Sequence, residues 1–164
     1  MNEQRLKYLG YSIVFQEVPD EVTLAINISG CPHRCEGCHS QYLWEYEGNY
    51  ISDDLIELIK KYKGLITCVC FMGGDQNWVE LAQLAHIVDH YGLKVALYSG
   101  LPSRLSLYGI AVYFDYVKVG VYNSSLGGLA SKTTNQRMYR QINKPSNIWE
   151  DITYKFWKED KVNG

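Results

Sequence analysis

The residues of this sequence that are best suited to chemistry gather in one short segment. Cys31, Cys35 and Cys38 follow one another with the spacing C-x-x-x-C-x-x-C. Pro32 and Gly37 lie between them and favour a tight turn. A loop of this size can point three thiolates at one centre, so the spacing indicates a metal or iron–sulfur site.

The cysteine segment is open to three interpretations. Buried cysteines acting as small hydrophobic residues are disfavoured, because the flanking residues are polar. A structural zinc ion would need a fourth ligand, which His33 or His39 could supply. An iron–sulfur cluster is held by thiolates, and three thiolates on a four-iron cluster leave one iron without a protein ligand. Such an open position is typical of a reactive site rather than a structural one.

The elements that must position these cysteines alternate between strands and helices. Helices are expected from the N-cap candidates Ser52-Asp53-Asp54 to Gly64, and over Trp78 to Tyr91. The segment Ile148 to Trp157 fits either a strand or a helix. The alternation predicts parallel β/α units with right-handed crossovers. The expected strands are Ser12 to Val18, Val22 to Ile28, Leu65 to Met72, Lys94 to Tyr98 and Tyr116 to Tyr122.

Three polar or glycine-rich segments come directly after expected strands. They are the cysteine segment, Gly73-Gly74-Asp75 and Ser99-Gly100. Because sites in parallel β/α folds lie at the carboxyl ends of strands, we expect these segments to share one edge of the sheet. Cys68 and Cys70 alternate within an apolar strand, so they point to one face and are expected in the core.

Length and composition exclude several classes of protein. The 164 residues fit a single domain, 1–164, and are too few for a complete eightfold β/α barrel of about 250 residues. A net charge of -2 gives no basic footprint for nucleic acid or an anionic membrane surface. No apolar run approaches the roughly 20 residues that span a bilayer. The first residues do not resemble a signal peptide, and five cysteines is an odd number, so a reducing, cytoplasmic location is expected.

Taken together, these motifs resemble the radical S-adenosylmethionine superfamily. The cysteine spacing after an early strand is its hallmark, and Gly73-Gly74-Asp75 stands where that superfamily has a Gly-Gly-Glu-like motif. Asp75 in place of Glu, and Gly37 where many members have an aromatic residue, depart from the broad pattern.

Within that superfamily the chain is similar to the activating proteins of anaerobic ribonucleoside-triphosphate reductases, from Val14 to about Tyr139. Asp75 and Gly37 both occur in activating proteins of this kind. The supporting segments are Asn27 to His33, Gly37 to His39 with Trp44 nearby, Met72 to Asp75, Tyr98 to Gly100, Val117 to Gly120, Gly127-Gly128, and Thr134 to Arg137.

The resemblance implies a partial β/α barrel with parallel strands, built around two cofactors. Cys31, Cys35 and Cys38 would ligate a [4Fe-4S] cluster, whose open iron would bind S-adenosyl-L-methionine. Gly73, Gly74 and Asp75 would hold the methionine end of S-adenosylmethionine. The backbone of Gly37 would contact the adenine. The remaining residues expected at the cofactors are Cys38, His39 and Ser99, with Lys118 as a candidate carboxylate partner.

The resemblance also implies a reaction and partners. The reduced cluster would cleave S-adenosylmethionine, and the 5′-deoxyadenosyl radical would take a hydrogen from a glycine of the large reductase subunit. An external one-electron donor such as flavodoxin or ferredoxin would be needed. Neither nucleic acid nor a membrane is expected as a partner. The short chain predicts a barrel whose open side receives the glycine-bearing loop.

Three alternatives to this function stay open. The chain could be a radical S-adenosylmethionine enzyme that acts on a small molecule. It could activate a different glycyl-radical enzyme. It could also be a structural zinc-binding module without enzyme activity.

Overall fold

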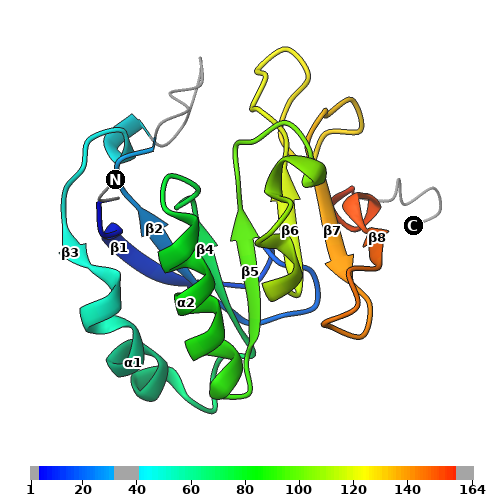
Figure 1. Ribbon diagram of the computed structural model, residues 1–164. Helices are drawn as coiled ribbons and strands as arrows, with labels where there is room; N and C mark the ends of the chain where they lie inside the picture. The colour runs from blue at the N-terminus through cyan, green and yellow to red at the C-terminus, as the bar shows by residue number, and fades with distance from the viewer. Residues whose placement is uncertain (1–3, 32–40, 158–164) are drawn as a thin grey trace, which may run out of the picture.

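The computed structural model describes residues 4–31 and 41–157, and these form one open sheet with two α-helices on one face (Figure 1). The helices are α1, Ile51–Tyr62, and α2, Trp78–His90. The strands are β1 (Lys7–Val14), β2 (Thr23–Ile28), β3 (Asn49–Tyr50), β4 (Cys68–Met72), β5 (Lys94–Tyr98), β6 (Tyr116–Val119), β7 (Arg137–Gln141) and β8 (Trp149–Asp151). Four short 3-10 helices complete the described part: η1 (Gln41–Leu43), η2 (Arg104–Leu107), η3 (Ala111–Tyr113) and η4 (Thr153–Phe156).

The sheet is mixed, with a parallel centre and antiparallel flanks. The order of its eight described strands is β3-β1-β2-β4-β5-β6-β7-β8. The neighbours β2, β4, β5 and β6 pair in parallel, whereas β1 and β7 add antiparallel strands on either side. The expected α/β class is therefore confirmed. The expectation of parallel strands holds for the centre of the sheet but not for its flanks.

The first strand lies earlier in the chain than the sequence predicts. β1 ends at Val14, which pairs with Thr23 at the start of β2. Because the two strands are antiparallel neighbours, residues 15–22 have to connect them and cannot extend the strand to Val18. At the other side of the sheet, β6 stops at Val119 rather than Tyr122, since Gly120 has φ +110 and turns the chain away.

The first helix is capped differently from the prediction, whereas the second is as expected. α1 begins at Ile51, and its N-cap Tyr50 makes no side-chain capping bond, so the prediction of an N-cap at Ser52-Asp53-Asp54 is wrong. The two aspartates instead occupy the first turn, where carboxylates stabilise the positive end of the helix dipole. α2 begins after Asn77, whose side chain accepts a hydrogen bond from the Glu80 amide at 3.0 Å.

The regular alternation of strands and helices stops after β5. In residues 99–115, all of which the structure describes, the connection to β6 contains η2 and η3 and no α-helix. The segment Ile148 to Trp157 forms both a strand, β8, and a 3-10 turn, η4. In the described ranges, neither α-helix is long and apolar enough to cross a membrane.

Side chains of the central strands alternate between two buried faces. The face toward α1 and α2 carries Ile26, Phe71 and Leu97, which pack in one core with the helices. The other face, called the opposite face below, carries a second core that includes Cys68 and Cys70. β4 is therefore buried on both faces, as its apolar sequence predicts. The opposite face is covered by the β1–β2 connection and η4, through Val18, Ile152 and Phe156.

Candidate functional site

The cysteine segment leaves the sheet at the carboxyl end of β2 and is anchored there by backbone hydrogen bonds. The Gly30 amide donates to the Glu45 carbonyl at 3.0 Å, and the Cys31 amide donates to the Leu43 carbonyl at 3.0 Å. The chain thus departs and returns at the same place, which is the geometry that a ligand-wrapping loop requires. The other expected residues of this segment, Cys35, Gly37, Cys38 and His39, lie outside the described residues.

The glycine pair after β4 is required by the backbone. Gly73 and Gly74 have φ +108 and +101, a region that side-chain-bearing residues rarely adopt. A Cβ on Gly74 would lie 2.9 Å from Ile28 Cδ1 and 2.9 Å from Leu81 Cδ2, both in the buried core. The pair therefore makes a tight turn against the core, and this turn places Asp75 at the carboxyl edge of the sheet.

Ser99 and Asp75 form one polar unit at this edge. Ser99 is only 1% exposed, and its hydroxyl donates to Asp75 Oδ2 at 2.6 Å. The Leu101 amide in turn donates to Ser99 Oγ at 3.0 Å. Ser99 is thus a buried residue that orients the Asp75 carboxylate rather than a solvated turn serine. The predicted proximity of Gly73-Gly74-Asp75 and Ser99 is what the structure shows.

These segments border a cavity of about 190 Å³ at the carboxyl ends of the parallel strands. Cys31 lines it together with the glycine pair, Asp75 and Ser99. The floor consists of side chains that are register neighbours across four strands and that all point to the opposite face. These are Asn27, Met72, Tyr98 and Lys118.

Most of this floor was missed by reasoning from the sequence. Asn27 carried a usable signal, because it is a polar residue inside an otherwise apolar strand. Met72 and Tyr98 begin segments that support the resemblance, but the sequence does not place them in one floor, because only the pairing register brings them side by side. Lys118 also lines the cavity, and its ammonium lies 5.5 Å from the centre of the Tyr98 ring.

The described residues that line the cavity fit the expected cofactors. Cys31 is a free, half-buried cysteine at the cavity wall. Among the described residues no three His, Cys, Asp or Glu side chains gather into a metal site, and two of the three cysteines lie outside that part. The cavity offers a carboxylate, Asp75, for an ammonium group and a cation, Lys118, for a carboxylate, which suits the methionine end of S-adenosylmethionine.

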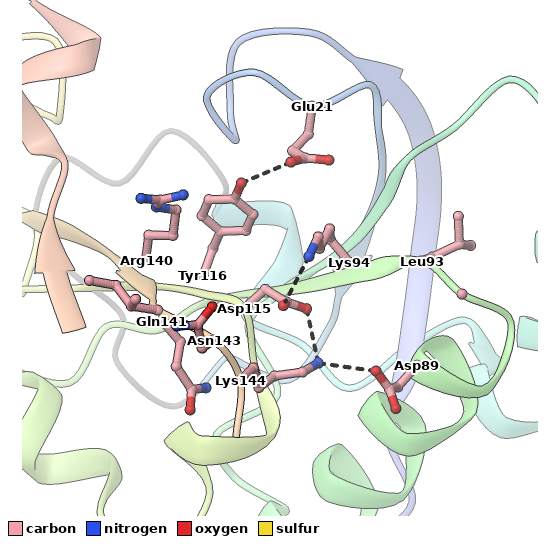
Figure 2. A pocket seen from close by; sticks show the side chains of 12 residues that line it. Glu21, Asp89, Leu93, Lys94, Asp115, Tyr116, Arg140, Gln141, Asn143 and Lys144 are labelled. Carbon is pink, nitrogen blue, oxygen red and sulfur yellow. Dashed lines mark hydrogen bonds and ion pairs between the residues drawn. The ribbon is translucent and has the colours of Figure 1, made fainter. Parts of the chain in front are cut away.

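A larger cavity of about 690 Å³ lies at the amino ends of the parallel strands, and four of the charged residues that line it, Asp89, Lys94, Asp115 and Lys144, form one network of ion pairs (Figure 2). The buried Asp115 accepts a hydrogen bond from Lys144 at 2.9 Å and one from the Val95 amide at 2.9 Å. Lys144 also lies 3.3 Å from Asp89 at the end of α2. This network fastens the β7–β8 hairpin to the helix, so the cavity has a structural explanation. None of the expected site residues lines it.

The two cysteines of β4 are core residues, as predicted. Cys68 and Cys70 are both 0% exposed. Burial, the main cause, raises the pKa of each thiol well above its usual value, because a thiolate would lose its hydration. Both side chains therefore remain neutral thiols at physiological pH, which is unsuitable for metal ligation.

Comparison with known proteins gives one match. Residues 21–101 match a family model described as a 4Fe-4S single cluster domain. No curated protein and no solved structure gives a significant match. The matched range contains the three clustered cysteines, Gly73-Gly74-Asp75 and Ser99. The match supports an iron–sulfur protein with a 4Fe-4S cluster, which is compatible with a redox enzyme.

Proposed function

We propose that this chain is a radical S-adenosylmethionine activase that generates a glycyl radical on a large anaerobic ribonucleotide reductase subunit. One observation carries the proposal. Cys31, Asp75 and Ser99 border a single cavity at the carboxyl ends of three adjacent parallel strands, inside the range that matches a 4Fe-4S domain. A structural zinc site would not need a cavity with a carboxylate, Asp75, and an ammonium group, Lys118, beside its first ligand.

The residues have separate tasks in this proposal. Cys31, Cys35 and Cys38 hold the cluster, and Asp75, oriented by Ser99, accepts hydrogen bonds from the methionine ammonium. Gly73 and Gly74 bring backbone close to the same group, while Gly37 and His39 belong to the loop expected to border the adenine and the cluster. When bound, the cluster supplies the electron that cleaves S-adenosylmethionine reductively to methionine and the 5′-deoxyadenosyl radical.

The open sheet supports a macromolecular substrate. The described sheet ends at β3 on one side and β8 on the other and does not close into a barrel. About 190 Å³ is below the roughly 300–1,000 Å³ of a typical small-molecule pocket, so a nucleoside would extend beyond it. We expect a glycine-bearing loop of the reductase to cover the exposed side of a partial β/α barrel.

Two experiments test the proposal in order. The protein is first purified anaerobically and analysed for iron, acid-labile sulfide and zinc. About four irons and four sulfides per chain are expected, with loss of both in Cys35→Ala. About one zinc per chain without sulfide would favour the zinc module. The protein remains in the cytoplasm in this proposal, so the reducing conditions of the assay are those of its compartment.

The reduced protein is then mixed with S-adenosylmethionine, a one-electron donor such as flavodoxin, and the candidate reductase. A glycyl doublet in the EPR spectrum of the reductase is expected, and Cys35→Ala abolishes it. Cleavage of S-adenosylmethionine without a doublet on any glycyl-radical partner would favour a small-molecule substrate instead.

A further inference from the structure

The proposed function leaves two buried thiols of β4 without a role, and one of them lies directly beneath the site cavity. Cys70 is 0% exposed and sits in the layer below the cavity floor, two residues before Met72. Its register neighbours on β2 and β5 are Ala25 and Ala96. Alanine side chains are too short to cover the thiol from the neighbouring strands. The side chains one layer closer to the cavity therefore determine whether a molecule in the cavity can contact Cys70.

Met72 is the side chain between this thiol and the cavity. Its sulfur accepts a hydrogen bond from the Cys70 thiol, with Sγ and Sδ 3.5 Å apart. Met72 itself lines the cavity. The S–H bond of Cys70 is therefore directed at a residue of the cavity floor, and a single thioether separates the two.

Tyr98, the register neighbour of Met72, closes the floor on the other side without offering its hydroxyl to the cavity. That hydroxyl donates to the backbone carbonyl of Glu17, in the β1–β2 connection that covers the opposite face. The floor thus presents a thioether and an aromatic ring. The Tyr98 O–H bond is directed at the Glu17 carbonyl, and the Cys70 S–H bond is covered by Met72.

We propose that Met72 is a barrier residue that keeps the Cys70 thiol out of reach of a carbon radical formed in the site cavity. This inference rests on the proposed function. Because burial keeps Cys70 protonated, a hydrogen atom is always available on its sulfur. A thioether has no S–H bond to give, and methionine is flexible enough to fill the gap fully.

The side reaction that the barrier prevents is a single hydrogen-atom transfer. The C5′ radical of 5′-deoxyadenosyl would take the hydrogen of Cys70, so that a C–H bond forms as the S–H bond breaks homolytically. The products are 5′-deoxyadenosine and a thiyl radical on Cys70, with no further electron or proton required. Each such event would consume S-adenosylmethionine without activating the partner, which is the kind of side reaction that a protein must exclude.

The first test measures access to Cys70 without radical chemistry. The anaerobic protein with its cluster is treated with N-ethylmaleimide, and labelling of each cysteine is followed by mass spectrometry. In Met72→Ala, labelling of Cys70 is expected at least tenfold faster than in the wild type, and S-adenosylhomocysteine should slow it. Met72→Leu, which fills the same space, should behave as the wild type.

Met138→Ala is the matched control, because Met138 is also 0% exposed and lies in the core of the opposite face. It belongs to β7 and does not line the site cavity. Equal labelling of Cys70 in Met138→Ala and Met72→Ala would mean that any cavity loosens this core, and would overturn the inference. Cys68, one layer deeper, should stay unlabelled in both variants.

The second test follows the hydrogen atom. The reduced variants are equilibrated in D₂O, given S-adenosylmethionine without a partner, and the 5′-deoxyadenosine is analysed by mass spectrometry. Met72→Ala should yield deuterated product, from the exchanged thiol, and the further change Cys70→Ala should remove the label. The wild type should yield at least tenfold less deuterated product.

The outcomes separate this inference from the proposed function. Undeuterated 5′-deoxyadenosine from Met72→Ala overturns the barrier role even if Cys70 has become open to alkylation. If no variant forms 5′-deoxyadenosine, the proposed function fails and the inference fails with it. Cleavage with deuterium transfer only when Met72 is truncated and Cys70 is present supports both.

Discussion

Replacing Ser99 by alanine tests whether the polar unit at the carboxyl edge of the sheet acts on the cofactor through Asp75. The Ser99 hydroxyl donates to Asp75 Oδ2 at 2.6 Å, and a hydrogen bond to a charged group contributes about 1.5–3 kcal/mol. This bond exists before and after ligand binding, so the affinity changes only by the cost of holding the Asp75 carboxylate in its binding orientation without the Ser99 hydroxyl. We expect about 1.4 kcal/mol of that cost, a tenfold weaker binding of S-adenosylmethionine.

The binding assay uses S-adenosylhomocysteine and S-adenosylmethionine in calorimetric titrations of the anaerobic protein with its cluster. Both ligands carry the same α-amino and carboxylate groups, so the affinity for both should fall if Asp75 holds the ammonium group. Ser103→Ala is the control, because Ser103 is an exposed serine whose hydroxyl lies 3.3 Å from that of Ser106. Unchanged affinity for both ligands in Ser99→Ala would refute a positioning role.

The Ser99→Ala substitution also separates a positioning role from a loss of folding. The Leu101 amide loses its acceptor, so the free energy of unfolding should fall by about 1 kcal/mol. A protein of ordinary stability remains folded after such a loss. A drop in affinity together with a native circular dichroism spectrum therefore assigns the effect to Asp75.

Three further predictions concern the stability of the fold. Gly74→Ala should lower the free energy of unfolding by about 2–4 kcal/mol, because its Cβ meets buried carbons at 2.9 Å and its φ is +101. Gly73→Ala should lower it by only about 1–2 kcal/mol, because the nearest atom to its Cβ is 3.6 Å away. Lys144→Met should cost about 2 kcal/mol, because Asp115 loses a charged partner at 2.9 Å in a buried setting. Burial, and then a hydrogen bond to a carboxylate, raise the pKa of Tyr8 to about 12, above the value near 10 of an unfolded tyrosine. The unfolded chain therefore releases this proton first, and stability should fall from pH 10 to 12, less so in Tyr8→Phe.

Urea unfolding measures all three, each against a matched variant. Equal losses for the two glycine variants would contradict the packing argument. Lys155→Met breaks a pair with Asp20 whose side chains are 36% and 73% exposed, and should cost under about 1 kcal/mol. If Lys155→Met lowered the free energy of unfolding as much as Lys144→Met does, the argument that burial strengthens the Lys144–Asp115 pair would be contradicted. Tyr108→Phe, at an 82% exposed tyrosine, should leave the alkaline decline unchanged.

The parallel centre of the fold could be predicted from the sequence, whereas its flanks could not. β5 lies where its apolar pattern and the flanking glycines indicate, because a strand buried on both faces has a distinct composition. β7 has the sequence Arg-Met-Tyr-Arg-Gln, which lacks a clear apolar period. β7 is stabilised by pairing with β6, and the order of apolar and polar residues within one strand does not reveal which strand it pairs with.

The candidate site was predictable in its motifs but not in its floor. Gly73-Gly74-Asp75 and Ser99 come together because each follows a parallel strand, which is a general rule of such sheets. Met72 and Tyr98 become neighbours only through the register of β4 with β5. The direct bond between Ser99 and Asp75 likewise depends on side-chain rotamers, which spacing alone does not specify.

The cover of the opposite face has a consequence for how the chain is made. Lys155 pairs with Asp20 at 2.7 Å, across 135 residues of sequence, and Ile152 and Phe156 close the core over Cys68 and Cys70. A ribosome releases the chain from its N-terminus, so the thiols of β4 emerge long before the residues that cover them. We therefore expect the Cys68 and Cys70 thiols to be more open to oxidation before residue 156 has emerged than in the folded protein.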